Sequence, residues 1–145
     1  MRELKQFDAA IKELENAIEL DPGNAVRHNN FGVAFYEKRD FAKAAEAYRK
    51  AIAIEPSNAL YHANLALALQ ELKQFDAAIK EREKAIELDP ENADRHNRLG
   101  LAFYAKKDFA KAEEAYRKAI AIEPANALYH DKLALEHFSI RLGVA

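Results

Sequence analysis

The fold of this chain follows from one stretch, Asn24–Pro56, which reads NAVRHNNFGVAFYEKRDFAKAAEAYRKAIAIEP. Its first residue, Asn24, has a side-chain oxygen that can accept a hydrogen bond from an unpaired amide, which predicts the start of a helix. Residues 25–38 contain no proline, and large side chains recur there at helical spacing: His28, Phe31 and Phe35. Gly32 lies among them, where the missing side chain lets another helix come close. The first half of the stretch therefore predicts one amphipathic helix.

The second half of the same stretch predicts another helix. Arg39 and Asp40 interrupt the first pattern, and the Asp40 carboxylate is a suitable cap for a new helix. One buried stripe then follows at helical spacing: Phe41, Ala44, Tyr48, Ala51 and Ile52. Pro56 ends the helix, because proline cannot continue it and disfavours helix at the preceding residue. The result is two antiparallel helices of about 14 residues, roughly 21 Å each.

This unit recurs every 34 residues along the chain. Four residue types share the period: Phe7, Phe41, Phe75 and Phe109; Pro22, Pro56, Pro90 and Pro124; Asn24, Asn58, Asn92 and Asn126; His28, His62, His96 and His130. A longer period of 68 lies on top, because residues 73–80 repeat residues 5–12 and residues 115–124 repeat residues 47–56 without a change. Each larger unit is a pair of unlike repeats copied once. Recent tandem duplication and deliberate engineering would both leave this pattern.

The repeats predict an all-α protein. One helical hairpin cannot bury both of its sides, so consecutive hairpins must stack. We expect a right-handed superhelix of antiparallel helix pairs, an α-solenoid without strands. In each pair we call the helix before the Asp40-type turn first-type and the helix after it second-type.

The period also predicts how the chain is divided. We expect a single domain over residues 1–145. It would consist of a partial repeat at 1–24, with one full second-type helix at about 7–20, then full repeats at 25–58, 59–92 and 93–126. Residues 127–145 would form a capping first-type helix, helical over about 127–140.

These residues resemble the signature of the tetratricopeptide repeat (TPR) family, and the resemblance covers essentially the whole chain. The signature positions are His28, Phe31, Gly32, Phe35, Ala44, Tyr48, Ala51 and Pro56, then His62, Leu65, Ala66, Leu69, Ala78, Arg82, Ala85 and Pro90, then His96, Leu99, Gly100, Phe103, Ala112, Tyr116, Ala119 and Pro124. Two departures stand out. Histidine replaces the usual tryptophan at the first position throughout, and Arg82 stands where a large aromatic side chain is expected. We therefore expect thinner or partly solvated packing near Arg82.

Two interpretations of the terminal helices stay open. A second-type helix near residue 7 and a first-type helix near residue 127 are complementary in kind, so they could stack between molecules. The last helix instead carries polar residues, since Asp131-Lys132 and Glu136-His137 replace Ala63-Asn64 and Ala68-Leu69 of the earlier copy. Polar replacement on a terminal helix is typical of a cap. We favour a soluble cap.

The resemblance implies a protein-protein interaction scaffold. In TPR proteins the first helix of each repeat lines a concave groove that takes an extended peptide or a partner helix. Carried over by position, the peptide-binding residues would be Asn29, Asn30, Val33, Tyr36, Asn64, Leu67, Gln70, Asn97, Arg98, Leu101, Tyr104, Lys132 and Leu135. Asparagine can pair with peptide amides whatever the ligand's sequence, and tyrosine offers wide contact with a polar tip. The alternative is that these are ordinary solvent-facing helix residues.

Two ligand modes of the family match this chain only in part. The clamp that grips a terminal carboxylate would use the positions of Asn29, Val33, Asn64, Asp94 and Arg98. Only Asn64 and Arg98 agree with it, and Asp94 would repel a carboxylate. The asparagine-rich groove of the sugar-transferring enzymes that modify Ser and Thr is matched by Asn30 and Asn64, but Arg98 and Lys132 interrupt it. The resemblance implies backbone-directed peptide binding and no particular partner.

Composition argues against several classes of protein. Lys plus Arg number 22 against 24 Asp plus Glu, so the basic excess typical of nucleic-acid binding or of binding to anionic membranes is missing. There is no Cys, which excludes disulfides and thiolate chemistry. No run approaches the ~20 apolar residues of a membrane span, and residues 1–5 lack the apolar stretch of a secretory signal. We expect no nucleic-acid or membrane partner, and a cytoplasmic location by default.

The sequence contains no motif for catalysis or for a cofactor. The periodic histidines lie a repeat apart with no carboxylate in register, which favours packed replacements for tryptophan over metal ligands. Phosphate-binding loops and nucleophile turns are missing. We expect no enzyme activity, no cofactor and no metal. The competing functions are a scaffold for a protein or peptide, and a self-associating or engineered repeat scaffold without a natural ligand.

Overall fold

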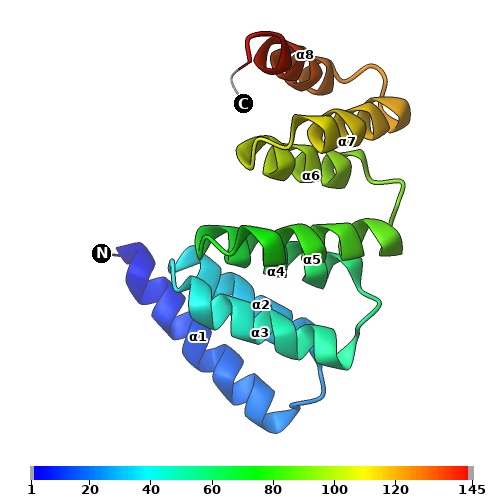
Figure 1. Ribbon diagram of the computed structural model, residues 1–145. Helices are drawn as coiled ribbons and strands as arrows, with labels where there is room; N and C mark the ends of the chain where they lie inside the picture. The colour runs from blue at the N-terminus through cyan, green and yellow to red at the C-terminus, as the bar shows by residue number, and fades with distance from the viewer. Residues whose placement is uncertain (1, 144–145) are drawn as a thin grey trace. The chain divides into compact units, whose positions relative to one another are not determined.

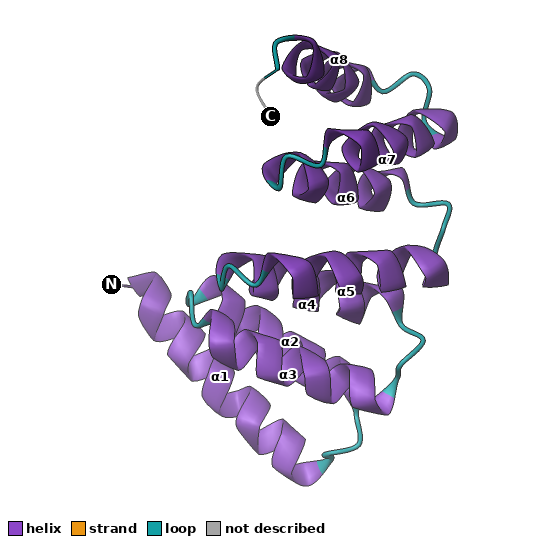
Figure 2. Ribbon diagram, in the orientation of Figure 1, coloured by secondary structure: helices purple, strands orange, loops and turns teal. Residues whose placement is uncertain are grey.

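The computed structural model describes residues 2–143, and within this range it has eight helices and no strand (Figures 1 and 2). The helices are α1 (Arg2–Leu20), α2 (Ala25–Glu37), α3 (Phe41–Ile54), α4 (Ala59–Glu71), α5 (Phe75–Leu88), α6 (Ala93–Ala105), α7 (Phe109–Ile122) and α8 (Ala127–Arg141). The predicted all-α class is confirmed. Residues 1, 144 and 145, which belong to the expected first and last segments, lie outside the described range.

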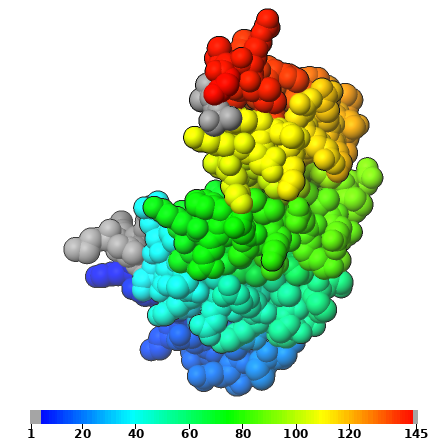
Figure 3. Space-filling view, in the orientation of Figure 1, coloured from blue at the N-terminus to red at the C-terminus, as the bar shows by residue number. Residues whose placement is uncertain are grey.

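Contacts between residues divide the chain into two compact units, residues 1–81 and residues 82–145. In the first unit α1 packs on α2, α2 on α3, and α3 on α4, and their surfaces follow one another from blue to green in Figure 3. In the second unit α6 packs on α7, and α7 on α8. Consecutive helices are therefore packed in pairs, as expected. The organisation of residues 1–145 as a single domain stays a prediction.

The helices begin where the capping residues predict. The Asn24 side chain accepts a hydrogen bond from the Arg27 backbone N–H at 3.2 Å, and Asp40 accepts one from the Lys43 N–H at 3.2 Å. Asn92 and Asp108 do the same in a later repeat. Each bond satisfies an amide that has no partner inside the helix, so these boundaries are set locally.

Glycine lets two tyrosine rings lie directly on first-type helices. A Cβ atom at Gly32 would stand 2.5 Å from Tyr48 Cε1, and one at Gly100 would stand 2.5 Å from Tyr116 Cε1. Both rings are buried, and burial raises the pKa of Tyr116 to about 12. The predicted close approach at Gly32 is confirmed.

Arg82 corrects one expectation. Only 6% of its surface is exposed, so the position is buried and not partly solvated. The methylene groups of an arginine can occupy apolar surroundings while the guanidinium finds polar partners. A charged residue at an aromatic position therefore need not open the packing.

The start of α1 also differs from the prediction. The helix begins at Arg2, whereas a helix from about residue 7 was expected. Residues 3–12 and residues 71–80 have the same sequence, but residues 72–74 form a turn between α4 and α5. That turn is closed by hydrogen bonds from the Lys73 and Gln74 amides to carbonyls of α4, both at 2.9 Å. In α1 the same residues are helical, so their own sequence does not fix this turn, which depends on the carbonyls of α4.

Glu136 corrects one part of the interpretation of α8 as a water-adapted cap. Its side chain is 0% exposed, and neither carboxyl oxygen has a hydrogen-bond partner among the described residues. Burial raises the pKa of Glu136 to about 7, and Glu113 and Arg117 of α7 are near enough to influence it. Asp131 and His137 are exposed as expected. The polar replacement at Glu136 therefore lies against α7 and does not face water.

The turn between the helices of each pair contains a residue in the left-handed region. These residues are Arg39 (φ 66°), Lys73 (φ 61°) and Lys107 (φ 62°). Such a conformation costs about 1–2 kcal/mol for a residue with a Cβ atom.

Lys107→Gly is expected to raise the free energy of unfolding by about 0.5–1 kcal/mol, because glycine adopts this φ without a clash. Urea denaturation measures the change. Ala105→Gly is the matched control, since Ala105 is the last residue of α6, and it should lower stability by about 1 kcal/mol. Changes of the same sign in both variants would contradict the explanation.

Candidate functional site

In the first unit, the predicted groove residues lie on α2 and α4, which contact each other. The Asn64 side-chain N–H donates to Asn29 Oδ1 at 2.8 Å, and this bond links the two helices. Asn29 is only 7% exposed. The structure therefore places Asn29 between the helices, where its oxygen is already bonded.

The other residues of this set form an accessible surface. Val33 is 40% exposed, Asn30 is exposed and Leu67 is half-buried. Gln70 is exposed. Tyr36 is half-buried, and the centre of its ring lies 5.2 Å from the centre of the Phe41 ring. We call Asn30, Val33, Asn64, Leu67 and Gln70 the first-helix face of the first unit. It combines aliphatic side chains with amides, which can donate and accept hydrogen bonds.

In the second unit, the corresponding residues lie on α6 and α8. Asn97 is buried, and its Oδ1 atom has no hydrogen-bond partner among the described residues. Lys132 stands where the repeat pattern would place the donor that Asn64 provides in the first unit. In the second unit a lysine therefore takes the place of the asparagine that bonds Asn29 in the first unit.

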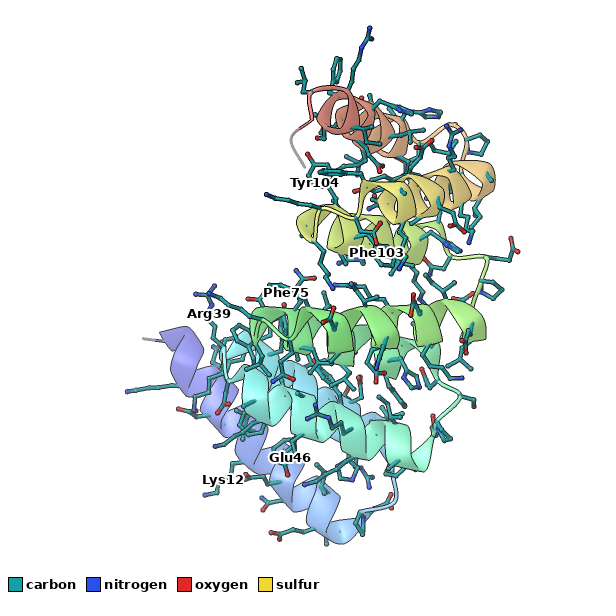
Figure 4. All side chains as sticks on the ribbon, in the orientation of Figure 1. Lys12, Arg39, Glu46, Phe75, Phe103 and Tyr104 are labelled. Atoms are coloured by element: carbon teal, nitrogen blue, oxygen red, sulfur yellow. The ribbon has the colours of Figure 1, made fainter. Side chains whose placement is uncertain are left out.

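The exposed part of the second unit is more charged. The Arg98 guanidinium pairs with the Asp94 carboxylate at 2.5 Å, so its charge is neutralised within its own helix. Leu101 and Leu135 are exposed. The Tyr104 hydroxyl lies 2.9 Å from Ser139 Oγ, and Figure 4 shows Tyr104 and Phe103 leaving α6 on different sides. We call Arg98, Leu101, Tyr104, Lys132 and Leu135 the first-helix face of the second unit.

Repeat-family models match most of the chain. A model described as TPR repeat matches residues 1–39, 32–73 and 68–107, and one described as tetratricopeptide repeat matches residues 93–126. The chain belongs to the tetratricopeptide-repeat family. Repeats of this kind form protein-interaction scaffolds, which is the general role of this TPR chain. A comparison with curated proteins finds no significant match.

Solved TPR structures resemble the chain over most of its length. The crystal structure of MamA has a TM-score of 0.88 at 26% identity and covers 97% of this chain and 82% of its own. The Arabidopsis OM64 TPR domain has a TM-score of 0.72 at 27% identity, with coverage of 78% and 93%. The first TPR of Spaghetti (RPAP3), bound to an HSP90 peptide, has a TM-score of 0.75 at 22% identity, with coverage of 81% and 93%. These similarities support the TPR fold.

The histidines at the first TPR signature position link each first-type helix to the loop before it. The Nε2 atoms of His28, His62, His96 and His130 lie 2.8–2.9 Å from the carbonyl oxygens of Pro22, Pro56, Pro90 and Pro124. A carbonyl oxygen only accepts, so Nε2 carries the hydrogen in each case. The first three rings are buried, as expected for packed replacements of tryptophan, whereas the prediction is wrong for the exposed His130.

Among residues 5–143, whose side chains the structure describes, no group of three or more histidine, aspartate or glutamate side chains is placed to hold a metal ion. Within the same range, no helix combines the length and the apolar character that crossing a membrane requires.

Proposed function

We propose that this TPR chain binds an extended peptide segment along the first-helix faces of its units. The observation that carries this proposal is an aliphatic side chain at the same position of every first-type helix: Val33, Leu67, Leu101 and Leu135. Val33 is 40% exposed and Leu101 is 38% exposed, although both are central in their helices. Exposed aliphatic positions that recur beside polar groups are typical of interaction surfaces.

The polar neighbours suit a peptide backbone. In the first unit the amides of Asn30, Asn64 and Gln70 surround the aliphatic side chains, and amides can bond both the N–H and the C=O of an extended chain. In the second unit Arg98 and Lys132 take the equivalent places of Asn30 and Asn64. The HSP90 peptide bound to the RPAP3 domain shows a peptide held by a protein with this fold. We infer a ligand recognised mainly through its backbone and apolar side chains.

The test begins with a displayed library of random linear peptides. For peptides that bind, Val33→Asp and Leu101→Asp are expected to weaken the affinity by at least about tenfold, since each places a charge in an apolar contact. Ala42→Asp is the control, because Ala42 is exposed on α3, a second-type helix. Equal losses of affinity in all three variants would contradict peptide binding at these faces. Unchanged affinity in the Val33→Asp and Leu101→Asp variants would contradict it as well.

Association between copies is a second candidate. Phe138 is 64% exposed and Leu142 is 72% exposed at the end of α8, a combination that favours contact with another protein surface. Light scattering behind size exclusion, over a range of concentrations, tests it. A mass that rises with concentration would support this candidate, and a constant mass near 16.4 kDa would exclude it.

A further inference from the structure

Among the three buried histidines, His62 has a carboxylate partner at its second ring nitrogen, whereas His28 has none. In each ring Nε2 donates to a proline carbonyl, which leaves Nδ1 for another group. In His62 that group is the Glu81 carboxylate of α5, with Nδ1 and Oε2 2.7 Å apart. Both members are shielded from water, since 9% of the His62 side chain and 28% of the Glu81 side chain are exposed. The middle repeat thus holds a carboxylate against its histidine.

The repeats on either side lack this carboxylate. The positions equivalent to Glu81 are Ala47 beside His28 and Ala115 beside His96. In the first unit, His28 and Ala47 line a cleft of about 230 Å³ between α1 and α3, with α2 as its floor. His28 Nδ1 is buried and has no hydrogen-bond partner among the described residues. The missing side chain therefore leaves a space and an unpaired polar atom.

The second unit repeats the cleft. His96 and Ala115 line a cleft of about 330 Å³ between the end of α5 and α7, with α6 as its floor. The linings of the two clefts agree at position after position along the 68-residue period, including Ile18 with Ile86 and Phe35 with Phe103. The two clefts therefore share most of their lining, although Leu99 replaces Phe31 and Glu87 lines only the second.

The side chains around each cleft define what could fill it. The walls and floor are apolar, with Ile18, Phe31 and Phe35 in the first cleft. Lys43 stands at the edge with Nζ 5.3 Å from the centre of the Phe35 ring, and Lys111 stands likewise at 5.4 Å from Phe103. An aliphatic stem would be accommodated by the walls, and an anionic end would meet a histidine and a lysine.

The acidic residues at the edges are partly neutralised. Glu46, which projects from α3 on the side facing α1 in Figure 4, pairs with Lys50 at 3.1 Å. In the second cleft Glu114 pairs with Lys118 at 2.8 Å, and the bond to Lys118 lowers the pKa of Glu114. Glu15 also lines the first cleft. Neither Glu15 nor Glu46 bonds His28 Nδ1, so in the first cleft the place that Glu81 fills in the middle repeat is open.

We propose that the His28 and His96 clefts are equivalent binding sites for a carboxylate carried on a short apolar stem, which accepts a hydrogen bond from the histidine Nδ1–H. Because Nε2 donates to a proline carbonyl, the ring carries a hydrogen on both nitrogens when this ligand is bound. Glu81 is the chain's own example of this ligand, held at the third copy of the site. The carboxylate could come from a glutamate of a partner protein or from a small free acid. The sites lie on clefts between second-type helices, so they are separate from the first-helix faces of the proposed function.

The test follows the histidine rings by NMR while butyrate is added, and in a second series while an unstructured peptide with one glutamate is added. The His28 and His96 signals are expected to move and saturate, while the His62 signals stay in place because Glu81 occupies that site. Tighter binding of the peptide than of butyrate would assign the sites to a partner's side chain, and the reverse would assign them to a free acid. A peptide with glutamine in place of glutamate should not compete.

Variants make the assignment specific. Ala47→Glu is expected to fill the first cleft and weaken binding at His28 by at least about tenfold, leaving His96 responsive. Ala53→Glu is the control, because Ala53 is an exposed residue of the same helix α3. Glu81→Ala should open the third site, so that the His62 signals move when butyrate is added. Butyrate should also restore part of the free energy of unfolding that this substitution removes.

Three results would overturn the proposal. The first is shifts at His28 and His96 no larger than those at His62. The second is an unchanged His28 response in a folded Ala47→Glu variant. The third is a Glu81→Ala variant whose His62 signals ignore butyrate.

Discussion

Tyr48→Ala is expected to lower the free energy of unfolding of the unit formed by residues 1–81 by about 3–5 kcal/mol. Tyr48 is 3% exposed and belongs to the core that includes Phe35, Ala44 and Leu65. Its ring lies against Gly32, which has no side chain to move into the space that alanine would leave. Urea denaturation followed by circular dichroism measures the loss.

Phe75→Ala is the size-matched control for Tyr48→Ala. Phe75 is 45% exposed, so its loss should cost about 1 kcal/mol or less. A cost for Tyr48→Ala as small as that of Phe75→Ala would contradict the role of the buried ring.

A double-mutant cycle tests the contact between Gly32 and Tyr48. Gly32→Ala alone should cost about 1–3 kcal/mol, because the added Cβ atom would overlap the Tyr48 ring. In the Tyr48→Ala background the same change should cost nothing further, since the overlap is gone. Additive costs would mean that the two residues do not interact.

Glu136→Gln is expected to stabilise the protein at alkaline pH and to leave its stability unchanged in acid. Burial raises the pKa of Glu136 from 4.5 to about 7, so the folded protein holds a proton that the unfolded chain has released. The stability contributed by Glu136 is therefore fully present below pH 4.5 and is lost as the pH rises through about 7. At about 1.4 kcal/mol per pH unit, the loss amounts to about 3–4 kcal/mol.

The measurement is the free energy of unfolding of both proteins between about pH 4 and about pH 8. Glutamine has nearly the shape of the protonated acid and cannot ionise, so the two curves should meet in acid and separate above pH 5 or so. Glu91→Gln is the control, because Glu91 is exposed and should give a curve parallel to that of the original protein. Parallel curves for Glu136→Gln as well would show that the carboxyl group is not buried in solution.

Much of the fold could be predicted because its signals are local. Asn24, Asp40 and Pro56 mark helix boundaries through their own hydrogen-bonding groups or ring, without help from distant residues. Gly32 predicts a close approach because, without a side chain, it lets a neighbouring group contact the helix backbone. The repetition of these residues then extends the local argument to the whole chain.

The candidate site could be predicted only in outline. The repeat positions identify which helices form the first-helix faces, but Asn29 and Asn97 are buried while the residues after them, Asn30 and Arg98, are exposed. Neighbouring residues on a helix differ by about 100° in direction, so the residue that faces the ligand depends on how the next helix packs. The sequence holds one signal for the histidine clefts: Glu81 interrupts the repeat at a position where the neighbouring repeats have Ala47 and Ala115. That this position faces the histidine is seen only in the structure.

Caps, prolines and apolar spacing act within a few residues, so the helices, their order and their pairing can be derived from the chain's own residues. The identical segments 3–12 and 71–80 differ in conformation, and the turn in the second depends on tertiary contacts, since carbonyls of α4 close it. The burial of Glu136 likewise depends on tertiary structure, since α7, a separate helix, packs against α8. Groups whose environment comes from another element cannot be assigned from their own neighbours in the chain.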